Sequence, residues 1–208
     1  MRRFSVRPAI TLKGRKFKGL RGWAGKPAHP PLTDFPVAAY VLAAAFDVIS
    51  VIGGDGNEWG HDFWRAATYT MIGGAIVSVF TALTGFFDWW RSSEPGNQAR
   101  RTANTHAVIM LSVTVLVIVN VIVRLTRYNT DASTPIGIMV LSLVIAALVS
   151  WGATYGGSLV FDYGFNVETA GDSPVWHQSE TDVFPGDKGA ADHGPSGRHD
   201  EPRRASGT

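Results

Sequence analysis

The sequence predicts an all-α fold: a four-helix transmembrane bundle with both termini cytoplasmic and with disordered polar tails. The first observation is that apolar residues are concentrated in four blocks of the 208-residue chain, separated by short polar connections. The second is block length, because about 20 apolar residues in a helix cross a hydrocarbon core roughly 30 Å thick. The third is that polar residues fill both ends. The chain therefore divides into an arm at 1–28, a membrane domain at 29–162 and a tail at 163–208.

The two ends of the chain carry opposite charge. Residues 1–28 contain nine Lys or Arg and no acid, whereas residues 161–208 contain nine acids and four bases. No apolar run of signal-peptide length follows the basic residues, so we expect a retained arm that sets the topology. Adhesion of this arm to anionic headgroups is the alternative. The tail lacks hydrophobic periodicity, which predicts disorder, with a short docking motif as the alternative.

The first span is expected at about 35–53, after a proline-rich segment. Thr33 or Asp34 would cap this helix, and Pro36 suits its first turn, where a missing N–H costs little. Asp47 interrupts the span about 18 Å above its start, at the helical rise per residue. A carboxylate at this depth needs a partner, because lipid supplies none.

The partner of Asp47 is expected on the third span, at about 105–125. His106 and Asn120 share one helical face of this span, and Arg124 follows one turn after Asn120. Asn120 and Arg124 lie at a depth similar to that of Asp47, so a contact between Asp47 and either is predicted. This intramembrane polar contact is interpreted as structural, with a proton or ligand pathway as the alternative.

The second and fourth spans are expected at about 63–90 and 135–161. Small and polar residues recur along one face of the second span, which would let a neighbouring helix approach closely: Thr70, Gly74, Thr81, Gly85 and Asp88. In the fourth span, Gly152 and Gly156 form one GxxxG pair, which indicates close packing inside a membrane.

Positive residues indicate the cytoplasmic side of the membrane. The arm is strongly basic, and the connection between the second and third spans contains three arginines, so both termini are predicted to be cytoplasmic. This topology brings a group of polar and small residues toward the cytoplasmic leaflet: His29, Asp88, His106, Gly156 and Gly157. In an up-down bundle the first and third spans are commonly diagonal, so the two histidines could meet across the core.

Three chemistries fit this cluster. His29 and His106 could be axial ligands of a b-type haem, with Gly156 and Gly157 making room and Asp88 orienting a ring. The same histidines with Asp88 could instead form a two-histidine, one-carboxylate metal site. The third interpretation is a hydrogen-bonded cluster that seals the bundle end. The absence of cysteine excludes a disulfide framework, thiolate zinc sites, cysteine-ligated iron–sulfur clusters and covalent haem attachment through cysteine.

The order of these short motifs resembles a family of bacterial four-helix membrane proteins built on a domain of unknown function. The resemblance covers about residues 29–167 and rests on motifs that begin with His29-Pro30, continue through Asp88-Trp89 and His106, and end with Gly156-Gly157-Ser158. Some members of that family are joined to Rieske-type iron–sulfur domains. This resemblance implies an association with redox proteins and favours haem or quinone chemistry. This chain has no cysteine and therefore no such cluster of its own.

The sequence therefore predicts a multi-pass protein of a bacterial cytoplasmic membrane, with the lipid bilayer and a redox membrane complex as partners. Its leading function is a redox-associated subunit that binds haem, or a metal, near the cytoplasmic leaflet. The alternatives are a non-catalytic scaffold or interaction protein and, less favoured, a small transporter that uses Asp47, Asn120 and Arg124. No motif for nucleic-acid binding is present in the sequence.

Overall fold

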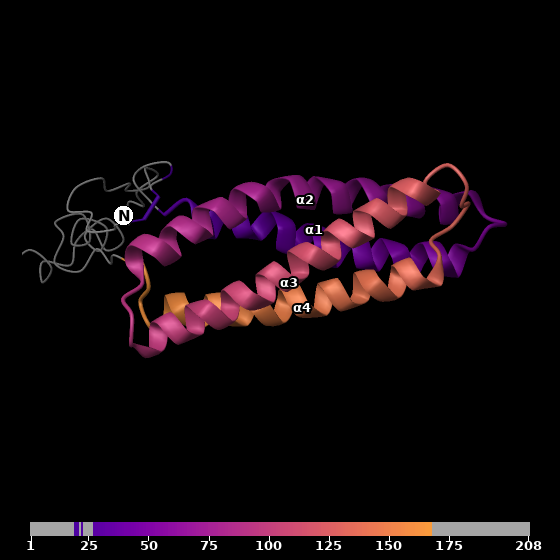
Figure 1. Ribbon diagram of the computed structural model, residues 1–208. Coiled ribbons are helices and arrows are strands. Elements are labelled where there is room, and N and C mark those ends of the chain that lie inside the picture. Colours follow the sequence, from indigo (N-terminus) through magenta and orange to yellow (C-terminus); the bar gives the residue numbers. More distant parts are fainter. Residues whose placement is uncertain (1–18, 21, 23–26, 168–208) are drawn as a thin grey trace, which may run out of the picture. The chain divides into compact units, whose positions relative to one another are not determined.

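The computed structural model describes residues 19–20, 22 and 27–167, so most of the basic arm and of the acidic tail lie outside the described residues. The described residues form four helices: α1 (His29–Gly53), α2 (Glu58–Ser92), α3 (Gln98–Arg127) and α4 (Ile136–Phe161). Each helix is long and apolar enough to cross a membrane. Figure 1 shows the four helices side by side as a bundle. The predicted all-α, four-span fold is confirmed.

The helices pack in a ring in which each touches two neighbours. Within the described residues, α1 packs against α2 and α4, and α3 packs against the same two helices. The backbones of α1 and α3 do not come close enough to pack against each other. The first and third helices are therefore diagonal, as expected for an up-down bundle. In Figure 1, α3 runs obliquely across the bundle, beside α4. This obliquity matters for the site, because it separates α3 from α2 along part of their length.

α1 begins earlier than predicted. It begins at His29, after Ala28, and no side chain caps its first turn. Thr33 instead donates its hydroxyl to the carbonyl of Pro30 at 2.7 Å, so the expected capping by Thr33 or Asp34 is wrong. The physical reason is that proline is tolerated in a first helical turn, where the N–H groups have no intrahelical acceptor. The proline-rich segment is therefore part of the helix.

Pro36 lies inside α1 and removes one intrahelical hydrogen bond. A helical residue normally donates its N–H to the carbonyl four residues earlier, which for position 36 is Leu32. Thr81 of α2 lies close enough to replace that donor, with its Oγ1 atom 3.2 Å from the Leu32 oxygen. The same hydroxyl lies 3.1 Å from the Val77 oxygen of its own helix. α2 thus compensates for the proline in α1.

Two other helices also begin earlier than the apolar blocks suggest. α2 begins at Glu58 and α3 at Gln98, so parts of the predicted connections are helical. The Asn97 side chain caps α3 by accepting the Arg100 N–H at 2.8 Å. Hydrophobic length marks the portion of a helix inside lipid, whereas a cap marks the end of the helix itself.

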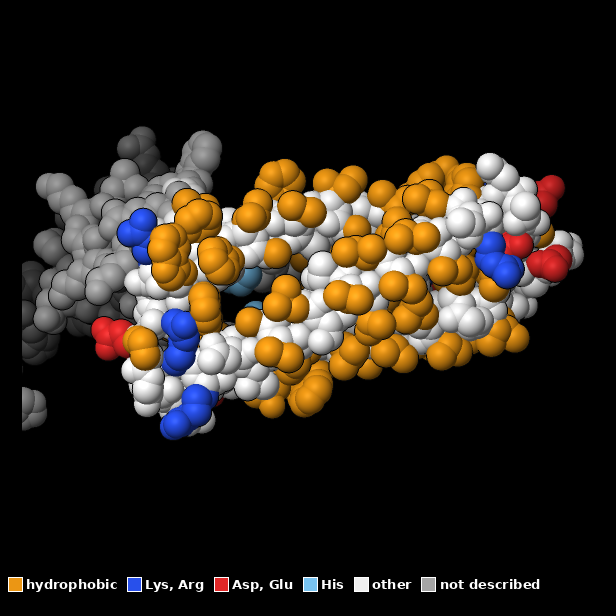
Figure 2. All heavy atoms as spheres, in the orientation of Figure 1, with side chains coloured by type: hydrophobic (Ala, Val, Ile, Leu, Met, Phe, Trp, Pro, Cys, Tyr) orange, Lys and Arg blue, Asp and Glu red, His pale blue; other side chains and the backbone are white. Residues whose placement is uncertain are grey.

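The core contains apolar residues from all four helices: Tyr40, Ala43, Met71, Val113, Val117, Ile145 and Val149. Small residues bring the helices together around it. A Cβ added at Gly74 would lie 2.8 Å from Tyr40, and one at Gly152 would lie 3.0 Å from Ile109. The glycine positions predicted to permit close packing do so. Large apolar side chains elsewhere face outward, as the orange surface in Figure 2 shows, and are suited to contact lipid.

Candidate functional site

His29 is held against α2 by its Nδ1 atom. Nδ1 lies 3.0 Å from the Thr81 carbonyl oxygen and 3.3 Å from the Thr84 hydroxyl oxygen. A carbonyl oxygen can only accept a hydrogen bond, so Nδ1 must carry the proton. The Thr84 hydroxyl has its own acceptors, the Phe80 and Thr81 carbonyls, each at 3.0 Å. In the neutral ring, the lone pair of His29 therefore resides on Nε2.

His106 is held in the same manner by a different helix. Its Nδ1 atom lies 2.9 Å from the Gly152 carbonyl oxygen of α4. The same reasoning places the proton on Nδ1 and the lone pair on Nε2. Both rings are half-buried. Each histidine thus has its tautomer and orientation fixed by a backbone carbonyl on the helix next to its own.

A glycine lies against each histidine ring. A Cβ at Gly85 would lie 2.6 Å from Cε1 of His29, which is closer than two such atoms can approach. A Cβ at Gly156 would lie 3.3 Å from Cε1 of His106. The missing side chains therefore let the rings lie close to the backbones of α2 and α4.

The Nε2 atoms are left with their lone pairs unused. Among the described residues, neither Nε2 accepts or donates a hydrogen bond, because the contacts of both rings run through Nδ1. Figure 2 shows a hollow beside α3 with pale blue histidine atoms in it. The remaining described histidine, His61, lies near the start of α2, at the other end of that helix from Thr84 and Gly85. His29 and His106 are therefore the described histidines at this end of the bundle.

Asp88 makes no hydrogen bond with either histidine in the described part of the chain. This buried carboxylate accepts the backbone N–H of Leu20 at 3.2 Å, so it binds the segment that precedes α1. Within the described part of the chain, no three His, Asp or Glu side chains are grouped so as to hold a metal ion. The orienting groups are instead Thr81, Thr84 and Gly152. Gly157 is set apart as well, since a Cβ there would meet no atom within 4 Å.

A second polar cluster, which we call the ionic layer, lies toward the other end of the bundle. Arg124 of α3 forms a salt bridge with Asp47 of α1, and both side chains are fully buried. The Arg124 Nε atom donates to Asn120 at 2.5 Å, and Nη1 and Nη2 donate to Thr68 at 3.3 Å and Ser142 at 2.9 Å. All four helices thus contribute a side chain to this layer.

The connection between α3 and α4 completes the ionic layer. Thr134 donates its hydroxyl to the second oxygen of Asp47 at 3.0 Å, and its N–H to Ser50 at 2.9 Å. The Arg124 guanidinium also lies 5.2 Å from the centre of the Trp64 ring. The Trp64 indole N–H is buried without an acceptor among the described residues. Because Asp47 and Arg124 bond to other members of the layer, its geometry supports helix packing rather than a path for a solute.

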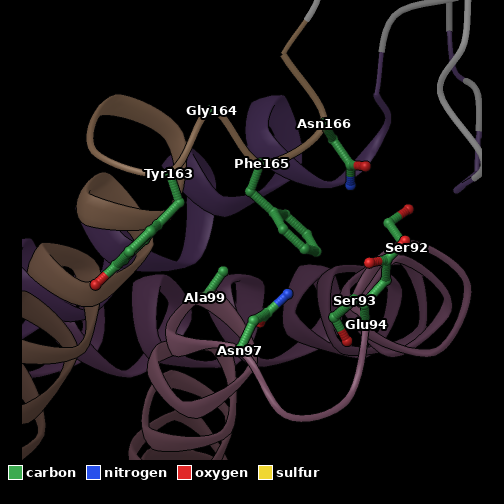
Figure 3. A pocket seen from close by; sticks show the side chains of 9 residues that line it. All are labelled: Ser92, Ser93, Glu94, Asn97, Ala99, Tyr163, Gly164, Phe165 and Asn166. Atoms are coloured by element: carbon green, nitrogen blue, oxygen red, sulfur yellow. The ribbon is translucent and has the colours of Figure 1, made fainter.

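A pocket of about 240 Å³ lies where α2 ends and α3 begins. Its wall includes Ser92, Asn97 and residues that follow α4. In Figure 3 the Phe165 ring points into this pocket, while the Tyr163 hydroxyl points away from it. The histidines do not line it. It is therefore separate from the site described above.

Sequence reasoning selected the two histidines and Gly156 but did not assign Thr81, Thr84, Gly85 or Gly152 to the histidine site. Three of these carried a signal of close packing, because Thr81 and Gly85 belong to the predicted small-residue face of α2 and Gly152 belongs to the predicted GxxxG pair. That face does meet α1, through Gly74, Thr81 and Gly85. The two carbonyl groups carried no signal, because every residue has one and only packing decides which of them a ring can reach.

The fold and the buried polar groups define an integral membrane protein of the four-helix class. A family described as "Predicted membrane protein (DUF2231)" matches residues 25–169, and the chain belongs to this family. The match covers the whole helical region. No curated protein and no solved structure matches the chain.

Proposed function

We propose that this membrane protein is a redox-associated subunit that holds a b-type haem through His29 and His106. The observation that supports the proposal is the shared state of the two rings. Each donates Nδ1–H to a backbone carbonyl of an adjacent helix and leaves a neutral Nε2 without a partner in the described structure. Metal-ligating histidines are commonly held in this manner, because the hydrogen bond sets the tautomer and raises the basicity of the other nitrogen.

The surroundings of the rings also suit a haem. The two histidines come from diagonal helices, an arrangement that would let them flank a group bound between them. Gly85 and Gly156 keep the ring edges free of side chains, and the apolar lining of a membrane bundle suits a hydrophobic macrocycle. Two neutral imidazoles add no charge to the bilayer, which limits the cost of burying the site.

A haem bound there would supply one-electron transfer, at a potential set by its axial ligands and their hydrogen bonds. The chain's own residues hold the ligands. Thr81 and Gly152 orient the rings through their carbonyls, and Thr84 supports His29. Asp88 acts elsewhere, by binding the segment before α1. We place the protein in a bacterial cytoplasmic membrane, where the redox partner would be another component of the same membrane.

The experiment is a reduced-minus-oxidised visible spectrum of the full chain, purified in detergent from cells supplied with haem precursor. The wild-type protein is expected to show a b-type signal with near-stoichiometric haem. His29→Ala and His106→Ala should each remove most of this signal. His61→Ala is the matched control, since His61 lies near the opposite end of α2 and makes no side-chain hydrogen bond with the described residues. It should keep the spectrum.

Gel filtration and circular dichroism on the same samples establish that each variant is folded. A folded, haem-replete wild-type protein without a chromophore would overturn the haem proposal. Metal analysis then separates the remaining possibilities, because a stoichiometric metal lost in both histidine variants would assign the pair to a metal. Absence of both would leave the scaffold function, which the closed hydrogen bonding of the ionic layer favours.

A further inference from the structure

Three side chains at the interface of α2 and α3 form a further cluster on the membrane-facing surface, which we call the tyrosine–arginine cluster. Tyr69 of α2 and Tyr128, which follows α3, are joined by a hydrogen bond between their hydroxyl groups. Their ring centres are 5.9 Å apart. The guanidinium of Arg65, one helical turn before Tyr69, lies 5.9 Å from the centre of the Tyr128 ring. The cluster thus concentrates a positive charge and two hydroxyl groups.

The Arg65 guanidinium has no carboxylate partner among the described residues, as is also true of Arg91, Arg100 and Arg101. In the described part of the chain, Arg65 forms no salt bridge, whereas Arg124 pairs with Asp47 and Arg127 pairs with Asp131 at 3.4 Å. Arg65 is exposed, and none of its N–H groups donates to another described residue. A guanidinium presents five N–H donors in a fixed planar arrangement that suits the oxygens of a phosphate.

The two tyrosines add a further donor. In a hydrogen bond between two hydroxyl groups only one proton is used, so one of the two O–H groups is free to donate outward. A tyrosine hydroxyl is protonated at neutral pH, and this hydrogen bond raises the pKa of Tyr128 further above its ordinary value. The cluster therefore offers donors and no anionic acceptor, which is the polarity that an anion requires.

The position of the cluster points to the level of the lipid headgroups. Tyr128 follows the last residue of α3, and the preceding outward-facing side chains of that helix, Ile122 and Leu125, are 56% and 57% exposed. On α2 the apolar surface continues from Tyr69 through Ile76 and Val79. Arg65 and Tyr128 thus lie where an exposed apolar band ends. Arginine and tyrosine are favoured at that boundary, where one end of a side chain meets hydrocarbon and the other meets water.

We propose that Arg65, Tyr69 and Tyr128 bind the phosphate of a membrane phospholipid. The guanidinium and the free hydroxyl proton contact the phosphate oxygens, and the acyl chains lie along the exposed apolar side chains of α2 and α3. The lipid would then bridge two helices. This site is independent of the histidine pair, which lies beside the other end of α2.

The test is native mass spectrometry of the full chain in mild detergent, titrated with phosphatidylglycerol. Wild-type protein is expected to retain one lipid more tightly than the rest. Arg65→Gln should weaken that first binding event about tenfold, as expected for the loss of one charge-assisted contact. Tyr128→Phe and Tyr69→Phe should weaken it less. Arg127→Gln is the matched control, because it removes the same charge from a residue adjacent to Tyr128 and should leave the affinity unchanged.

A second titration replaces the lipid with inorganic phosphate. Weak or absent binding of free phosphate supports the lipid assignment, because the acyl chains contribute to affinity. Equal affinity for free phosphate would overturn it in favour of a general anion site. If Arg65→Gln and Arg127→Gln bind lipid equally well, the cluster only links α2 to α3. The tyrosine variants keep the proposal testable if loss of Arg65 prevents folding.

Discussion

At the scale of single residues, the absence of a side chain is as important as its presence. Gly85 and Gly73 are both glycines of α2, yet a Cβ at Gly73 would meet nothing within 4 Å, while one at Gly85 would collide with the His29 ring. The collision is with a side chain, so His29 could move, but only by leaving the Thr81 carbonyl. The orientation of His29 therefore depends on a glycine in another helix.

Gly85→Ala is expected to lower the free energy of unfolding by about 1–2 kcal/mol, through loss of the His29 hydrogen bond and local displacement. Gly73→Ala should leave stability unchanged or raise it by up to about 1 kcal/mol, because alanine favours helix. The measurement is equilibrium unfolding in mixed detergent micelles, followed by far-ultraviolet circular dichroism. Equal stability of the two variants would show that His29 does not depend on this contact.

Arg124 and Arg127 lie one turn apart in sequence but differ in burial. Arg124 is fully buried, so Arg124→Met leaves the Asp47 carboxylate without its counter-charge and should cost about 3–5 kcal/mol. Arg127 is exposed, with 53% of its side-chain surface accessible, and Arg127→Met should cost less than about 1 kcal/mol.

Adding Asp47→Asn to Arg124→Met should recover part of the lost stability, because the buried charge is then removed. The same unfolding assay measures all three variants. If Arg124→Met lowers the free energy of unfolding as little as Arg127→Met does, the ionic layer does not determine the stability of the bundle. Transport activity that disappears in Asp47→Asn while cofactor content is kept would instead support a solute path.

At the scale of helices, α1 and α2 are linked by a hydrogen bond that compensates for the missing N–H of Pro36. Pro36 supplies no N–H, so the Leu32 carbonyl takes a hydrogen bond from Thr81 of α2. The carbonyl of Thr81 in turn accepts the proton of His29. One residue of α2 therefore serves both the backbone of α1 and the orientation of its first side chain.

Thr81→Val keeps the shape of the side chain but removes its hydroxyl, and should cost about 1 kcal/mol as the Leu32 carbonyl loses its donor. In a Pro36→Ala background the cost should be smaller, because the alanine N–H can reach Leu32 within the helix. A double-mutant cycle in the unfolding assay measures the difference. Identical costs in both backgrounds would argue that Thr81 acts only within α2.

At the scale of the whole molecule, the ionic layer and the histidine pair lie toward opposite ends of the bundle. The ionic layer joins side chains of all four helices and is closed by hydrogen bonds. The two histidines are bound separately to α2 and α4, and within the described residues their Nε2 atoms have no hydrogen-bond partner. The ionic layer therefore holds the four helices together, whereas the histidine end is where we propose that a haem binds.

An even number of spans places both termini on one side of the membrane, and the basic arm predicts that this side is the cytoplasm. The chain contains no cysteine, so single cysteines can be introduced without further changes. Asn97→Cys, between α2 and α3, should react with a membrane-impermeant maleimide only from the cytoplasmic side. Gly56→Cys, between α1 and α2, should react only from the opposite side. The reverse labelling pattern would invert the predicted topology.

The sequence alone predicted four spans, a diagonal arrangement of the first and third, and a partner for Asp47 on the third span. It could do so because span length, charge and helical spacing are local properties. The beginning of α1 was predicted too late, because its proline-rich first turn resembles a connection. The role of Asp88 was assigned to the histidines, whereas the structure shows its carboxylate bound to the segment before α1.

The sequence by itself determined that this is a four-span membrane protein, because hydrocarbon thickness and backbone hydrogen bonding leave few alternatives for four long apolar blocks. The tertiary structure decided how the two histidine rings are held. Thr81 and Gly152 orient the histidines through backbone carbonyls, and Gly85 acts through a missing side chain. Residue type gives every position a carbonyl and Gly85 its missing side chain, but only packing decides which of them lies within reach of a histidine ring.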